Sequence, residues 1–189
     1  MDKAPVRPLT HAYRLLNPGP VVLVSVGDGE RDNLFALTWN LPVRKDPPMV
    51  GILSGKRHFS YPFIERTGEF GISVPDRSLA DAVYGCGTTT GKKVDDKFAE
   101  FGLSREAAKR IKAPLVAEAV ATLECRVAQV VDLGASALLI AQILEASAAT
   151  EHFREGQWTF DGGLELLHHL SGKKFCTSTQ GIEISAKKR

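Results

Sequence analysis

Runs of apolar and β-branched residues, separated by turn signals, dominate the first part of the chain. Residues 21–26 are VVLVSV and residues 33–39 are NLFALTW, with a Gly-Asp-Gly turn close behind the first run. Two such runs around a glycine-rich turn predict a β-hairpin. The chain breaks at Asp46-Pro47-Pro48. Beyond this break, MVGILS at 49–54 predicts a third strand and EFGISV at 69–74 predicts a fourth.

Caps, apolar spacing and stop signals predict several short helices. They cover residues 10–16, with a stop at Asn17-Pro18-Gly19, and residues 60–66, 79–83 and 104–111. The segment 85–91 holds three glycines and three threonines, so we expect a loop there.

A second hairpin is predicted in the later part of the chain. Leu123, Cys125 and Val127 alternate with Glu124, Arg126 and Ala128, which indicates a half-buried strand. The following run at 137–146 is long enough for a helix, but the turn at 132–134 favours a hairpin with 119–131. We expect irregular structure from Glu151 onward. Six or seven strands with short helices predict a mainly β fold, a closed or nearly closed antiparallel barrel, as a single domain over 1–189.

Composition narrows the classes of function. The net charge of +2 is too small to favour nucleic acid or a membrane surface as the main partner. The three cysteines lie far apart, with no C-x-x-C pair, so we expect neither disulfides nor a metal site, and a reducing compartment fits. Because the N-terminus has no signal-peptide pattern and no apolar run is long enough to span a bilayer, we expect a cytoplasmic protein.

Three polar segments are candidates for ligand binding. The first, residues 33–40, is a strand that ends in Thr38-Trp39-Asn40 and leads into Leu41-Pro42, where we expect a proline-rich loop. A strand that ends in small polar groups and an aromatic ring suits a flavin, which needs both an apolar surface and hydrogen bonds. Alternatively, Trp39 is a core anchor and Asn40 a turn former.

The second segment, residues 54–70, places Lys56, Arg57, His58 and Ser60 at a strand-to-helix junction. A helix N-terminus with added cations and a hydroxyl favours a phosphate group. The alternative is a solvated turn in which Ser60 is an ordinary N-cap.

The third segment, residues 86–98, has the sequence CGTTTGKKVDDKF. Its glycines permit close approach of a ligand, its threonines offer hydroxyls, and Lys92, Lys93 and Lys97 offer charge. The alternative is a mobile surface loop.

The histidines do not indicate a metal site. His168 and His169 are adjacent, so on regular structure their side chains point apart, and no H-x-H or H-E-x-x-H motif is present. Nothing near Cys86 resembles a base that could activate it. We therefore assign no metal ligand and no catalytic side chain.

From about Leu15 to about Phe175, the chain resembles the flavin reductase-like, FMN-binding split-barrel family, most closely its flavoredoxin branch. The resemblance is carried by an ordered set of short motifs: Asn33 with Thr38-Trp39; Pro47-Pro48; His58-x-Ser60; Thr67-Gly68-Glu69-Phe70; Cys86-Gly87; Thr90-Gly91; Asp96-Lys97-Phe98; Ala113-Pro114; Leu123-Glu124-Cys125; Leu167-His168; and Gly172-Lys173-Lys174-Phe175.

This resemblance implies a homodimer that binds FMN non-covalently near the subunit interface. It implies that residues 37–40 and 56–60 line the ring and the phosphate, and that the 86–97 loop closes over the ligand. His58 stands where the family usually has Arg or Lys, so either Lys56 or Arg57 takes over that charge.

The candidate FMN-binding residues from the segments and the resemblance are Asn33, Leu37, Thr38, Trp39, Asn40, Ser54, Lys56, Arg57, His58, Ser60, Cys86, Gly87, Thr88, Thr89, Thr90, Gly91, Lys97 and His168.

The function that the resemblance implies is an NAD(P)H-dependent flavin reductase or a flavoredoxin-type electron-transfer protein. NAD(P)H is the candidate co-substrate, and a protein electron donor or acceptor is a candidate partner. One alternative is a non-enzymatic electron carrier on the same scaffold. The other is a small nucleic-acid-binding barrel, which the modest aromatic content of 7% and the nearly balanced charge disfavour.

Overall fold

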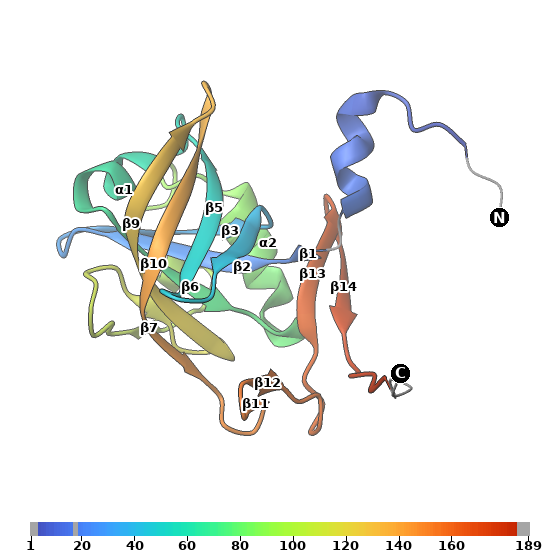
Figure 1. Cartoon of the computed structure of the whole chain (residues 1–189). Helices are drawn as coiled ribbons and strands as arrows, with labels where there is room; N and C mark the ends of the chain where they lie inside the picture. The colour runs from blue at the N-terminus through green and yellow to red at the C-terminus, as the bar shows by residue number, and fades with distance from the viewer. Residues whose placement is uncertain (1–3, 17–18, 185–189) are drawn as a thin grey trace.

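A curled antiparallel sheet of seven strands forms the body of the protein (Figure 1). The structure is a computed structural model and describes residues 4–16 and 19–184. In spatial order, the strands are β3 (Asp32–Leu37), β2 (Val22–Gly27), β6 (Glu69–Val74), β9 (Ala121–Asp132), β10 (Ser136–Ala148), β5 (Met49–Gly55) and β4 (Asn40–Arg44). Within this sheet β3 and β4 are the two edges, each paired with one neighbour, so the barrel is split between them.

Two apolar cores lie on opposite faces of this sheet. Strand β2 shows why, because successive side chains of a strand point to opposite faces and all six of its residues are buried. Val22, Val24 and Val26 belong to the core inside the barrel, which also contains Phe70 of β6. Leu23 belongs to the second core, between the sheet and the helices outside it. Apart from Ser25, β2 therefore carries no polar side chain, as in a sheet covered on both faces.

Short helices and smaller sheets surround the barrel. The helices are η1 (Leu9–Leu16) and η2 (Arg77–Leu79), both 3₁₀, and α1 (Tyr61–Thr67), α2 (Ala80–Thr88) and α3 (Lys97–Glu100). The smaller sheets are β1 (Gly19–Pro20) with β13 (Leu166–Ser171) and β14 (Lys174–Ser178), β7 (Arg105–Glu106) with β8 (Leu115–Val116), and β11 (Phe153–Arg154) with β12 (Gln157–Trp158). Figure 1 shows the β13–β14 hairpin standing beside the barrel, with η1 projecting near its far end.

Most of the predicted elements are confirmed. The β2–β3 hairpin, strands β5 and β6, and the long β9–β10 hairpin form where the apolar pattern predicts them. Helix α1 ends at Gly68, whose φ of 67° is the left-handed conformation that glycine adopts most readily. Asn17 and Pro18, the predicted stop of the first helix, lie outside the described residues.

Two predictions around residues 85–111 are wrong. Residues 85–88 are not a loop but the last turn of α2. Their glycines serve close packing: a Cβ on Gly85 would lie 2.4 Å from the ring of Phe101. The helix predicted over 104–111 is absent, and α3 forms earlier, where Asp96 caps it by accepting the backbone N–H of Ala99. The segment after β7 is instead held by the buried carboxylate of Glu124, which accepts two backbone N–H groups.

Two further regions hold more strand than predicted. Residues 40–44 form β4 rather than a proline-rich loop, because β5 supplies a pairing partner that the sequence does not reveal. The region after Glu151 is not irregular throughout, since it contains β11 to β14.

No helix within the described residues is both long enough and apolar enough to cross a membrane.

Candidate functional site

The outer edge of β3 borders two adjoining cavities. One has a volume of ≈ 290 Å³ and the other ≈ 330 Å³, and both are lined by Ala36, Gly87 and Thr88. We call the two together the β3 cleft, and refer to the smaller as the first cavity and the larger as the second. Volumes of this size are at the lower end for ligand sites, typically about 300–1,000 Å³, so an elongated ligand would need both cavities.

The backbone of β3 contributes to this cleft because no strand among the described residues pairs with its outer side. At the hairpin turn the N–H of Asp28 donates to the carbonyl of Arg31, which sets the alternation of hydrogen-bonded pairs along β2 and β3. By that alternation Leu34 and Ala36 direct their N–H and C=O groups away from β2. The ammonium of Lys97 confirms this for Leu34, because it donates to the carbonyl of Leu34 at 2.8 Å.

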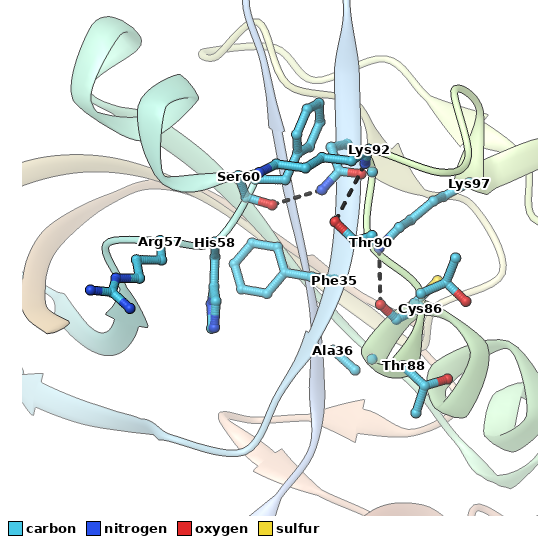
Figure 2. A pocket seen from close by; sticks show the side chains of 15 residues that line it. Phe35, Ala36, Arg57, His58, Ser60, Cys86, Thr88, Thr90, Lys92 and Lys97 are labelled. Carbon is cyan, nitrogen blue, oxygen red and sulfur yellow. Dashed lines mark hydrogen bonds between the residues drawn. The ribbon is translucent and has the colours of Figure 1, made fainter. Parts of the chain in front are cut away.

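The first cavity is polar and lies between two segments that are distant in sequence. Figure 2 shows Arg57, His58 and Ser60 on one side, from the turn before α1, and Cys86 and Thr88 of α2 on the other. The loop after α2 closes the remaining side with Thr89, Thr90, Gly91 and Lys92. The phosphate-type segment and the glycine-threonine segment of the sequence thus meet in one cavity.

A buried polar pair forms the floor of the first cavity. The side-chain amide of Asn33 donates to Ser60 Oγ at 2.7 Å, and the two residues are only 4% and 2% exposed. Ser60 stands at the N-cap of α1 but makes no side-chain capping bond. Since Asn33 donates to the oxygen, the hydroxyl proton of Ser60 remains available to a ligand. Ser60 therefore lacks the side-chain bond of an ordinary N-cap.

The loop after α2 is pressed against this pair at Gly91. A Cβ at Gly91 would lie 2.4 Å from the ring of Phe59 and 2.6 Å from Asn33 Oδ1, so only glycine fits without displacement. Arg31 holds the loop in place: it donates to the carbonyl of Gly91, pairs with Asp95 at 3.0 Å, and lies over the Phe59 ring.

The cations near the cleft differ in their surroundings. Lys56 pairs with Asp132 at 2.7 Å, and this hydrogen bond raises the pKa of its ammonium. Arg57 and Lys92 line the first cavity, and among the described residues neither pairs with a carboxylate. Of these two neighbours in sequence, Arg57 lines the first cavity and Lys56 does not.

Two ionisable groups at the cleft are buried, and burial shifts the pKa of each. Burial raises the pKa of the Cys86 thiol to about 12, so this thiol remains protonated at neutral pH and is not an activated nucleophile. Burial lowers the pKa of the Lys97 ammonium.

The second cavity is mainly apolar and aromatic. It is lined by Leu37 and Trp39 at the end of β3, by Val83 and Tyr84 of α2, and by Phe175 of β14. Trp39 is 48% exposed, so it is a surface of the cleft rather than the core anchor that we considered. A flat apolar ligand portion would find contacts here that the first cavity lacks.

The cleft gathers most of the candidate residues. In the first cavity are Asn33, Arg57, His58, Ser60, Cys86, Gly87, Thr88, Thr89, Thr90, Gly91 and Lys97, and in the second are Leu37, Thr38 and Trp39, with Gly87 and Thr88 again.

Four candidates lie elsewhere. Asn40 and His168 line a separate apolar cavity of ≈ 280 Å³ at one end of the barrel. His169, and not His168, faces the β3 cleft, because neighbouring residues of β13 point to opposite sides. Ser54 is buried in β5, and its hydroxyl has no partner among the described residues. Lys56 is turned toward Asp132 at the end of β9.

Several lining residues were not candidates from the sequence. They are Phe35, Ala36, Phe59 and Lys92 in the first cavity, and Val21, Val83, Tyr84, His169, Gly172 and Phe175 in the second. A signal existed for three of these, since Gly172 and Phe175 belong to a motif that carries the family resemblance, and Lys92 is one of the lysines that offer charge in the third polar segment. Phe35 and Ala36 could not be separated from ordinary strand residues without knowing that β3 is an edge.

Comparison with known proteins gives one family and consistent relatives. The model of the flavin reductase like domain matches residues 13–174. The uncharacterized protein YddH of Escherichia coli is 35% identical over 179 residues, which cover 92% of this chain and 94% of that one. An uncharacterized protein of Pyrococcus abyssi, PYRAB12460, is 31% identical and covers 87% of this chain and 93% of its own.

Solved structures share the whole fold. A structure described as an FMN-binding domain of a flavin reductases-like enzyme from Shewanella baltica has a TM-score of 0.80 at 28% identity and covers 96% of this chain and 97% of its own. Flavoredoxin from Methanosarcina acetivorans has a TM-score of 0.81 at 23% identity, with 99% and 97% covered. The predicted barrel of the flavin reductase-like kind is thereby confirmed.

The close contact at Gly91 predicts a cost for adding one methyl group there. We expect Gly91→Ala to lower the free energy of unfolding by about 1–3 kcal/mol, because the Cβ must displace Phe59 or Asn33. Urea denaturation of the purified protein measures this. Gly181→Ala is the control, since its nearest atom would be 4.0 Å away. Equal stability of the two variants would show that the loop does not pack as described.

Proposed function

This chain belongs to the flavin reductase like family, and from that premise we propose that it binds FMN non-covalently in the β3 cleft, with the phosphate in the first cavity and the ring in the second. The observation that carries the proposal is the division of the cleft. Cations without carboxylate partners and hydroxyls lie at one end, apolar and aromatic walls lie at the other, and an unpaired strand edge runs between them.

The first cavity suits a phosphate group. Arg57 and Lys92 supply positive charge from its two sides, and the hydroxyl group of Ser60 is a third donor. Hydrogen bonds from cationic groups to a phosphate are among the stronger ones in proteins. Because no carboxylate competes for either cation among the described residues, both remain available to the ligand.

The second cavity suits a flavin ring. Its dimethylbenzene edge would contact apolar side chains such as Leu37, Trp39 and Phe175, which line this cavity. Its pyrimidine edge needs hydrogen bonds, and the outward backbone groups of Ala36 lie where the two cavities adjoin. An edge strand offers such groups at no conformational cost, because they are unpaired before the ligand arrives.

When bound, FMN would supply the redox chemistry itself, accepting a hydride or electrons and passing them on. The side chains of the cleft bind and orient. We assign none of them as a general acid or base: the Cys86 thiol is buried and protonated, and the Lys97 ammonium donates to two backbone carbonyls. The structural relatives from Shewanella baltica and Methanosarcina acetivorans, an FMN-binding domain and a flavoredoxin, support this assignment.

Binding of FMN is the first measurement. We expect the purified protein to show a flavin absorbance band or to take up added FMN, and Arg57→Met to weaken FMN binding by about tenfold. Lys56→Met is a matched control, because that lysine pairs with Asp132 and should leave FMN binding within about twofold. Protein that stays colourless and takes up no FMN would contradict the proposal.

The electron donor distinguishes an enzyme from a carrier. We propose that the protein is an NAD(P)H-dependent flavin reductase, since Trp39, which lines the second cavity, is 48% exposed and leaves an aromatic surface beside the flavin ring against which a nicotinamide ring can stack. With FMN present, steady-state oxidation of NADH or NADPH should then depend on the protein. A protein that binds FMN but oxidises neither nucleotide would instead be an electron carrier that works with a protein donor or acceptor.

A second copy of the chain is the partner we propose. Trp39, Leu41 and Val43 are large apolar side chains exposed along the segment that enters edge strand β4. A homodimer that covers this surface would bury them beside the cleft. Sedimentation equilibrium should give twice the 20.5 kDa of one chain, and the mass of a single chain at micromolar concentration would reject the homodimer.

A further inference from the structure

Lys97 is a buried cation without a counter-ion. It is 3% exposed, and its ammonium donates to the carbonyl of Leu34 at 2.8 Å and to the carbonyl of Cys86 at 3.0 Å (Figure 2 draws the latter). Among the described residues it forms no ion pair. Burying a charge without a counter-ion costs free energy, and hydrogen bonds to the buried group offset part of that cost.

The two carbonyls belong to the two walls of the β3 cleft. Leu34 is in β3, and its carbonyl points to the unpaired outer edge. Cys86 is in the last turn of α2, where carbonyls have no partner within the helix. Lys97 itself begins α3, a separate element. One side chain thus satisfies an orphan acceptor on each wall and ties the walls to a third element.

The residues next to these carbonyls form the junction of the two cavities. Ala36 follows Leu34 by two positions, Gly87 follows Cys86 directly, and both residues line both cavities. A Cβ on Gly87 would lie 3.2 Å from the Cβ of Ala36, so a side chain at position 87 would require the walls to move slightly apart. The spacing at this point decides whether a flat ring can reach the edge of β3.

We propose that Lys97 is a positioning residue that fixes the spacing between the edge of β3 and the end of α2, and so shapes the part of the cleft that takes the flavin ring. It does not act as a phosphate ligand. This inference rests on the proposed FMN site and changes the role that the sequence suggested for Lys97, which was to offer charge to the ligand.

Lys92 provides the contrast within the same loop region. It is exposed and lines the first cavity, and its ammonium has no hydrogen-bond or ion-pair partner among the described residues. Two of the three donors of Lys97 are already engaged by the chain. Lys92 can therefore contact a phosphate, whereas the ammonium of Lys97 is held by hydrogen bonds to the backbone.

Riboflavin separates the two roles, because it has the ring and the ribityl chain of FMN but no phosphate. A residue that binds the phosphate contributes to the affinity for FMN alone. A residue that shapes the ring site contributes equally to the affinities for FMN and riboflavin.

The experiment compares Lys97→Met with Lys92→Met in the full chain, with dissociation constants for FMN and riboflavin from quenching of flavin fluorescence. We expect Lys97→Met to weaken both ligands by the same factor, about tenfold or more, because two charge-assisted hydrogen bonds are lost. Lys92→Met should weaken FMN by about tenfold and riboflavin by less than about twofold. A Lys97→Met protein that loses FMN affinity but keeps riboflavin affinity would overturn the inference.

Lys97→Gln covers the case in which Lys97→Met does not fold. Its amide can still donate to a carbonyl, so we expect a smaller loss that is again equal for the two ligands. A loss for FMN alone would likewise overturn the inference.

A measurement without flavin keeps this inference separate from the proposed function. In the ligand-free protein, amide hydrogen exchange at Ala36 and at residues 87–89 should be faster in Lys97→Met or Lys97→Gln than in the wild type, and unchanged in Lys92→Met. Unchanged exchange in the Lys97 variants would reject the positioning role even if FMN binds. Wild-type protein that binds neither flavin, together with faster exchange in the variants, would reject the FMN site and keep the role of Lys97 in spacing the walls.

Discussion

The unpaired outer edge of β3 is the constraint on which the rest of the site depends. A strand edge leaves alternate N–H and C=O groups without partners, and a protein must cover, pair or use them. In this protein, two residues of the edge, Leu34 and Ala36, have different roles. The buried ammonium of Lys97 takes the carbonyl of Leu34, and the backbone of Ala36 stays open where the two cavities adjoin. Had β3 paired with β4, the barrel would close and this cleft would not exist.

Close packing around that edge explains the glycines of the region. Gly85 packs against Phe101, Gly87 against Ala36, and Gly91 against Phe59 and Asn33. In each case the missing side chain lets α2 or the loop after it approach another element. The same approach brings the threonines of this segment to the turn before α1, where Arg57 and Ser60 stand. A cleft with one charged end and one apolar end results from packing rather than from any single motif.

The local sequence places cations near the cleft, but contacts with residues distant in sequence decide which of these cations line it. Lys56 and Arg57 are neighbours with the same charge, but only one of them reaches the cleft, because Asp132 at the end of β9 pairs with the other. Lys92 and Lys97 lie five positions apart, and one is exposed while the other is buried against two carbonyls. By charge alone, the two residues of each pair could play the same role at the cleft. Their different contacts give them different roles.

The sequence by itself determined the strands, because alternation and continuous apolar runs are local properties: β2, β3, β5, β6 and the β9–β10 hairpin form where the pattern predicts them. It also indicated the three polar segments and, through an ordered set of motifs, the family. Only the tertiary structure decided which strand is an edge, and hence that Ala36 rather than Asn40 borders the cleft. It also decided that His169 rather than His168 faces the cleft. The glycines of α2, finally, belong to a packed helix and not to a loop. These outcomes depend on partners far away in the chain, such as β5 for β4 and Phe101 for Gly85, and a local pattern contains no information about them.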